Sequence, residues 1–168
     1  MLGAWCIVVL LCLAQIISTM DRGMLSLVVD PVRHDLSITD MQIALLQGVA
    51  FSVFYVLAGV ALGLVTDVVS RKWLLIAGIS VWSAATLATG LAENFTQMFV
   101  ARLLIGTGEA VMAPCAITLI ADLFPAKRRG KAMALYMFGS MIAFGLGTLL
   151  TGYVLEAAPE VRSMRWVA

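Results

Sequence analysis

Charged side chains are scarce in this chain: Asp, Glu, Lys and Arg make up 12% of its 168 residues, whereas 62% are hydrophobic. A soluble domain usually has about a quarter charged residues, and the mean hydropathy here is +1.01. The expected surroundings are therefore a lipid bilayer. The net charge is only +1, so the chain has no strong basic field that would indicate a nucleic-acid partner.

Histidine and cysteine, the usual metal ligands and nucleophiles, are also rare. The one histidine is His34, and the cysteines, Cys6, Cys12 and Cys115, lie in apolar runs without CxxC spacing. Such cysteines are typical of small packing residues rather than of disulfides or metal sites. The sequence also lacks a nucleophile–base set and a phosphate-binding loop. We therefore predict neither an enzyme nor a bound metal or organic cofactor.

Long apolar runs are abundant. A membrane-spanning helix needs about 20 apolar residues, and five segments qualify: about 2–29, 41–65, 73–92, 97–121 and 132–155. Short links separate them, so successive helices should be antiparallel neighbours. Pro31 and Pro125 follow two of the expected helix ends, where proline stops a helix. The expected fold is an all-α membrane bundle of five spanning helices.

Basic residues concentrate in alternate links. Those after the second and fourth segments hold Arg71, Lys72, Lys127, Arg128, Arg129 and Lys131, whereas those after the first and third hold only Arg33. Cytoplasmic links of membrane proteins carry an excess of Lys and Arg. We therefore expect a cytoplasmic N-terminus in the cell (inner) membrane, and we interpret the basic run at 127–129 as this topology signal rather than as a binding site.

Four charged residues fall inside the expected spans: Asp21, Arg22, Arg102 and Glu109. A charge at the bilayer centre costs about 2.5–3.5 kcal/mol on insertion scales, so it usually faces a partner or a wet cavity. Arg102 and Glu109 share one helix face, but about 10 Å of axial rise separates them. Because Asp21 and Arg102 should lie at similar depth, we predict a pair between these two side chains.

These charges suggest a proton-coupled conformational change. An apolar pocket favours the neutral form of a carboxyl group, and a nearby arginine favours the carboxylate. If the first and fourth helices move relative to each other, Asp21 and Glu109 would load and release a proton. The alternative is a static ion pair that only fixes helix packing. Gln15, Ser18, Gln47 and Tyr55 are candidates either for lining a pathway or for hydrogen bonds between helices.

The segment GLVTDVVSRKWLL resembles the loop-two signature of the major facilitator superfamily, G-x-x-x-D-x-x-x-R-K. The matching residues are Gly63, Asp67, Arg71 and Lys72, and Ser70 replaces the usual glycine. In the family the Asp and Arg of this loop help to latch the cytoplasmic side shut. By this resemblance the four residues form a cytoplasmic gate, with Asp122 as the expected local partner of Arg71.

The segment RLLIGTGEA resembles the helix-four motif R-x-x-x-G-x-G of the same superfamily, through Arg102, Gly106 and Gly108. The Asp-Arg pair at 21–22, the Gly-Glu-Ala at 108–110 and the glycine-rich stretch GSMIAFGLGTLLTG look like the Spinster branch of lipid transporters. In that branch the helix-one aspartate and helix-four glutamate are implicated in proton coupling beside the helix-four arginine. The matching residues here are Asp21, Glu109 and Arg102.

The resemblance implies a transporter of twelve helices in two bundles, with its substrate near the midplane. This chain would supply helices one to five of the N-terminal bundle, ending before helix six, and the C-terminal bundle of the same protein would be its partner. The expected substrate is an organic, lipid-like or amphipathic molecule, and a proton gradient would supply the energy. A small organic anion held by Arg22 or Arg102, or a membrane scaffold without transport, are the alternatives. Five glycines are expected to allow close helix packing: Gly59, Gly106, Gly108, Gly145 and Gly147.

Overall fold

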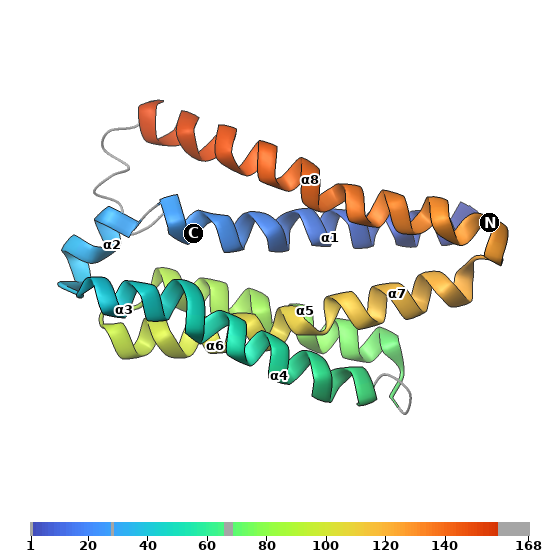
Figure 1. Ribbon diagram of the computed structural model, residues 1–168, viewed down its shortest axis with the longest axis horizontal. Helices are drawn as coiled ribbons and strands as arrows, with labels where there is room; N and C mark the ends of the chain where they lie inside the picture. The colour runs from blue at the N-terminus through green and yellow to red at the C-terminus, as the bar shows by residue number, and fades with distance from the viewer. Residues whose placement is uncertain (1, 28, 66–68, 158–168) are drawn as a thin grey trace.

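The computed structural model of the protein describes residues 2–27, 29–65 and 69–157, which form helices joined by short turns (Figure 1). The elements are α1 (Leu2–Leu27), α2 (Val29–Leu36), α3 (Asp40–Ala44), the π-helix η1 (Leu45–Val49), α4 (Ala50–Val65), α5 (Arg71–Gly90), α6 (Phe95–Ala110), α7 (Met112–Leu123) and α8 (Ala126–Ala157). Within these residues, five segments are long and apolar enough to cross a membrane: Gly3–Gly23, Asp40–Val65, Arg71–Gly90, Phe95–Leu123 and Ala126–Leu149. The chain is thus an all-α membrane protein, as the apolar runs predicted.

The helices form two groups. The first and last long helices, α1 and α8, pack along each other, and α6 packs against both α4 and α5 (Figure 1). The short helix α7 continues from α6 and contacts members of both groups. The fourth span therefore crosses from one group to the other, and its charged residues lie where the groups meet.

A proline divides the fourth span. The helix is interrupted at Val111, which separates α6 from α7. Pro114 has no N–H to donate to the carbonyl of Ala110, and its ring crowds that carbonyl, so the regular helix is broken one turn before the proline. The single helix expected over 97–121 is thus interrupted at one residue, whose backbone angles (φ −67°, ψ −30°) stay helical, and the span remains continuous.

The links predicted after the first and the fourth spans are partly helical in the structure. Residues 30–36 were expected in a link, but they belong to the helix α2, and Pro31 lies in its first turn, where a missing N–H costs little. Likewise α8 begins at Ala126, so the basic residues 127–131 occupy its first turns. Pro125 does lie between two helices, after the end of α7.

The second span begins with a capping box and then changes its winding. The Thr39 hydroxyl accepts a hydrogen bond from the Gln42 backbone, and the Gln42 side chain accepts one from the Thr39 backbone; this arrangement fixes the helix start. One turn later, η1 is wound as a π-helix. Short π-helical segments occur frequently at functional sites, and this one lies beside the charged residues described below.

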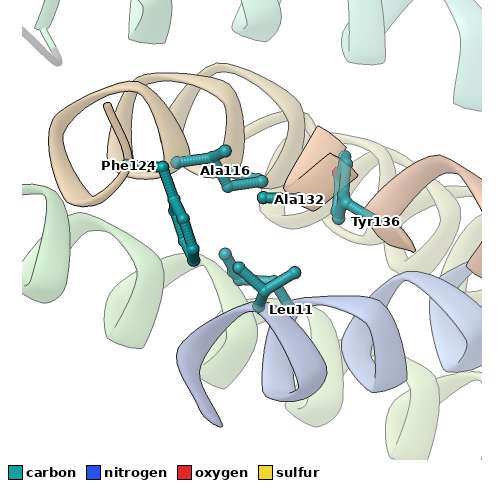
Figure 2. Packing of buried hydrophobic residues seen from close by; sticks show 7 residues of the cluster. Leu11, Ala116, Phe124, Ala132 and Tyr136 are labelled. Atoms are coloured by element: carbon teal, nitrogen blue, oxygen red, sulfur yellow. The ribbon is translucent and has the colours of Figure 1, made fainter. Parts of the chain in front are cut away.

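An apolar cluster closes one end of the bundle where α1, α7 and α8 meet. Its buried members are Val8, Leu11, Ala116, Ile120, Phe124, Ala132 and Tyr136. Figure 2 shows five of these side chains facing a common interior from the three helices. The ring of Trp5 also packs edge-on against Phe124, with centroids 4.9 Å apart. This packing joins α1 and α8 to the second half of the fourth span.

Beside this cluster, a polar bridge joins α1 to α8. The hydroxyl of Tyr136 donates to Oε1 of Gln15 at 2.8 Å, and Nε2 of Gln15 donates to Oγ of Ser140 at 3.0 Å. Gln15 thus makes hydrogen bonds between helices, which was one of the two roles considered for it.

We expect Tyr136→Phe to lower the free energy of unfolding by about 1–3 kcal/mol, because the Gln15 carbonyl loses its donor in a partly buried place. Unfolding of the full-length protein in mixed micelles measures this change. Tyr153→Phe is the matched control, since Tyr153 is 70% exposed. The double variant Tyr136→Phe/Gln15→Leu should recover part of the loss, because both polar partners are then gone; no recovery would contradict the explanation.

Candidate functional site

An ion pair joins the first and fourth spans, and the side chain of its basic member, Arg22, is 34% exposed. Glu109 on α6 is completely buried, and its Oε2 lies 2.7 Å from Nε of Arg22 on α1. The contact is an attraction between opposite charges at short distance. In a low-dielectric interior such an attraction is much stronger than in water. Sequence reasoning identified both residues but did not predict that they pair.

The Arg22 side chain has three further contacts. Its Nη2 donates to Oγ of the buried Ser18 at 2.9 Å. Its guanidinium carbon lies 5.3 Å from the ring centroid of Phe51 and 5.1 Å from that of Tyr55. The two rings stack on each other on α4, and cation–π contacts of this kind contribute about 0.5–2 kcal/mol each. Arg22 therefore holds α1 against both α4 and α6.

Asp21 points to a different helix. Its Oδ2 accepts hydrogen bonds from the indole Nε1 of Trp82 at 3.1 Å and from the hydroxyl of Thr86 at 3.4 Å, both on α5. The predicted pair between Asp21 and Arg102 is wrong: among the described ion pairs within 4.0 Å, none joins these two residues. The prediction rested on the similar depths of these two residues along their helices. Depth does not determine the direction in which a side chain points around its helix.

Arg102 is 5% exposed and lies on α6. Asp21 and Glu109 both attract its guanidinium through space, but its Nε has no hydrogen-bond partner among the described side chains. Arg102 thus adds positive charge to the site without closing a direct pair. The two carboxylates and two guanidiniums form one electrostatic cluster, in which only Glu109 and Arg22 touch.

A small cavity opens beside this cluster. Its volume is about 50 Å³, and it is lined by Arg22, Leu25, Ser26, Leu46, Gln47, Phe51 and Arg102. Such a volume holds a few water molecules or one small polar group. Both guanidiniums therefore border a polar space rather than only packed apolar side chains. Gln47 belongs to η1, so the π-helical segment helps to form the cavity wall.

The two glycines of the helix-four motif lie against different neighbours. A Cβ at Gly106 would be 2.9 Å from the carbonyl oxygen of Phe51 on α4. A Cβ at Gly108 would be 2.7 Å from the carbonyl oxygen of Gly78 and 2.8 Å from the backbone nitrogen of Trp82, both on α5. Each distance is too short for any side chain. These glycines let α4 and α5 approach α6 closely, which brings their side chains to the charged cluster.

The other three glycines that were predicted to allow close packing, Gly59, Gly145 and Gly147, have no neighbour at such a short distance among the described residues. A Cβ at Gly59 or Gly145 would have no atom of the described chain within 4 Å, and at Gly147 it would make an ordinary contact of 3.6 Å with Met20. The close approaches predicted for them are therefore absent from the described packing. Gly78, which is not among the five glycines predicted to allow close packing, faces Gly108 across the helix interface.

Two of the candidate gate residues, Arg71 and Lys72, begin α5. Arg71, the first residue of α5, forms an ion pair with Asp122 near the end of α7, as expected. The ammonium of Lys72 lies 5.8 Å from the ring centroid of Trp73. A Cβ at Gly63 would meet no atom of the described residues within 4 Å. Asp67 lies outside the described residues, so the structure places only part of the expected gate.

Within the described part of the chain, no cluster of three His, Cys, Asp or Glu side chains could hold a metal ion. The described site residues offer charge pairing and hydrogen bonding.

Known proteins resemble this chain in sequence and in fold. The profile of the Major Facilitator Superfamily matches residues 11–168. Protein spinster of Drosophila melanogaster is 34% identical over 158 residues, which are 94% of this chain and 26% of that protein. A probable L-galactonate transporter of Escherichia coli is 34% identical over 133 residues, covering 79% of this chain and 29% of that protein.

A solved structure shares the fold. It belongs to a bacterial homologue of the human lysosomal transporter Spinster in an inward-facing, unoccupied conformation. The TM-score is 0.84 at 29% identity, over 90% of this chain and 32% of that chain. The present chain thus spans less than a third of each of these proteins.

Proposed function

Because this chain belongs to the major facilitator superfamily, we propose that it works within a secondary transporter that moves an organic substrate across a membrane by alternating access, driven by protons. Family membership supports transport. The observation that carries proton coupling is the fully buried Glu109 in contact with Arg22, because ionisable residues inside a membrane protein commonly serve ion or substrate pathways.

The coupling step follows from the contacts of Arg22. When Glu109 takes up a proton, its charge is neutralised and its attraction to Arg22 weakens. Arg22 keeps its contacts with Ser18 and with the aromatic rings on α4, because these contacts do not depend on the charge of Glu109. The link between α1 and α6 is then loosened while that between α1 and α4 persists. Asp21 is the second proton-binding group, and Arg102 supplies a fixed positive charge nearby.

The leading substrate class is a lipid-like or amphipathic organic molecule. The cavity of about 50 Å³ would take only a small polar group of such a molecule, beside two guanidiniums and the apolar side chains of Leu25, Leu46 and Phe51. A small organic anion is the second candidate. It is favoured by the same pair of guanidiniums and by the similarity to the probable L-galactonate transporter.

We further propose a cell (inner) membrane location with a cytoplasmic N-terminus, on the strength of the basic residues near the start of α5 and α8. The ion pair between Arg71 and Asp122 then lies on the cytoplasmic side and acts as a latch, together with Gly63, Asp67 and Lys72. The C-terminal bundle of the same transporter, a small organic substrate and membrane lipids are its partners.

Glu109→Gln should abolish the acceleration of uptake by a pH gradient, because the amide cannot exchange a proton. The full-length protein is reconstituted in liposomes with a fluorescent single-chain phospholipid or L-galactonate as the probe. Wild-type uptake should rise when the gradient is imposed. Uptake by Glu109→Gln should not, while counterflow between equal concentrations continues.

The exposed Glu93 provides the control variant, Glu93→Gln, which should behave like the wild type. Gradient-driven acceleration that survives in Glu109→Gln would overturn the coupling role. If the wild type transports neither probe, the membrane-scaffold alternative becomes the better description.

A further inference from the structure

Two consecutive residues of α1, Asp21 and Arg22, have partners on different helices. On α1, Arg22 contacts Glu109 of α6, whereas Asp21 contacts Trp82 and Thr86 of α5. Asp21 thus binds neutral donors although two arginines are close to it. The packing of α5 in the bundle must therefore explain why this carboxylate binds to α5.

The close approach of α5 to α6 depends on Gly108. Trp82 is buried at 6% exposure, and its backbone nitrogen and Cβ lie 2.8 and 2.9 Å from where a Cβ of Gly108 would be. Because Gly108 has no side chain, α5 lies close enough for the Trp82 indole to reach across to Asp21. Thr86 is one helical turn further along α5, on the same face, and it donates to the same oxygen of Asp21.

We infer that Trp82 and Thr86 are positioning residues of the coupling site, which hold the Asp21 carboxylate on α5 and keep it from pairing with Arg22 or Arg102. Asp21 and Glu109 then bind protons as two separate groups, each with its own helix partner. This inference rests on the proton-coupled function proposed above.

The chemistry of the two donors fits this role. An indole N–H can only donate, so it stabilises a carboxylate and cannot itself accept the proton. The threonine hydroxyl adds a second donor to the same oxygen. The charged groups around Asp21 are Arg22 on its own helix and Arg102 and Glu109 on α6. Without the two donors, Asp21 is free to turn toward these arginines and to compete with Glu109 for Arg22.

The contact can be tested without a substrate. In the full-length protein labelled with ¹⁵N-indole tryptophan in nanodiscs, the Trp82 signal is assigned as the one that Trp82→Phe removes. We expect Asp21→Asn to move this signal strongly and Glu109→Gln to leave it in place. A Trp82 signal that is the same in Asp21→Asn and in the wild type would overturn the inference, whatever the transport results.

The positioning role is tested by transport of the fluorescent single-chain phospholipid and of L-galactonate. Trp82→Phe should lower gradient-driven uptake about tenfold, in line with the loss of a hydrogen bond to a charged group, and leave counterflow nearly unchanged. Thr86→Val, which preserves the shape of the side chain, should lower gradient-driven uptake about threefold. Trp73→Phe is the matched control, because Trp73 is 65% exposed on the same helix.

The outcomes separate this inference from the function on which it rests. If Asp21→Asn and Glu109→Gln both transport like the wild type, the proton-coupled function fails. If those two variants are uncoupled while Trp82→Phe and Thr86→Val behave like Trp73→Phe, only the positioning role fails. Equal losses of gradient-driven uptake and counterflow in Trp82→Phe and Thr86→Val would indicate damaged packing and would also overturn the positioning role.

Discussion

Gly108→Ala should lower the free energy of unfolding by about 3 kcal/mol and abolish gradient-driven transport. The added methyl group would lie 2.7 Å from the Gly78 carbonyl oxygen, 2.8 Å from the Trp82 nitrogen and 2.9 Å from the Trp82 Cβ. None of these atoms is the end of a flexible side chain, so α5 has to move as a whole. Overpacking of this kind typically costs about 1–3 kcal/mol, occasionally more. The displacement also carries the Trp82 indole away from Asp21.

Unfolding of the full-length protein in mixed micelles gives the stability change, and liposome uptake gives the functional one. Gly130→Ala is the matched control, because a Cβ at Gly130 would meet no atom within 4 Å in the part of the chain that the structure describes. Alanine is the better helix former by about 1 kcal/mol, so this control should be neutral or stabilised. Equal stability of the two variants would show that α5 and α6 are not in close contact at Gly108.

The number of spans was predictable because hydropathy is summed over about 20 residues, and a sum tolerates local errors. Interruptions within a span depend on single residues instead. Pro114 breaks the fourth span at Val111, although it lies in a run that is apolar throughout. The π-helical turn at Leu45–Val49 does not change a hydropathy average, so it could not be predicted from the hydropathy pattern.

The members of the charged cluster were predictable, but their pairing was not. A charge in an apolar run stands out, which is why Asp21, Arg22 and Glu109 were found from sequence. Their partners depend on how each helix is rotated about its axis, and packing at small residues such as Gly78 and Gly108 decides this rotation. The first and fourth spans alone could not show that the third span supplies donors to Asp21.

Trp82 and Thr86 were missed because both are neutral. The signal that could have found them is their spacing: two side chains able to donate hydrogen bonds lie four residues apart on one face of a span. In lipid such a face is more favourable when it has an acceptor to bind. A search of each span for hydrogen-bond donors, as well as for charges, would have selected α5 as a partner of the first span.

Arg22→Met should be the most destabilising change at the charged cluster, lowering the free energy of unfolding by about 3–5 kcal/mol. Removing one member of a buried ion pair leaves the other without compensation, and that cost exceeds the net value of the intact pair. Methionine keeps an unbranched chain that can still pack against Phe51 and Tyr55. Because a buried carboxyl group without a partner can neutralise itself by taking up a proton, the loss should be largest at a pH high enough to keep the completely buried Glu109 ionised.

A double-mutant cycle in mixed micelles tests this explanation. Arg22→Met/Glu109→Leu should recover most of the stability, because replacing both members of a buried pair by apolar residues is often neutral or stabilising by about 1–4 kcal/mol. The same cycle on Arg71 and Asp122 serves as the control. There the Asp122 side chain is 59% exposed, so we expect a coupling below about 1 kcal/mol. If the Arg22–Glu109 cycle gives an equally small coupling, the two residues do not form a buried pair in the membrane. The contact could then not act as the element that proton uptake weakens.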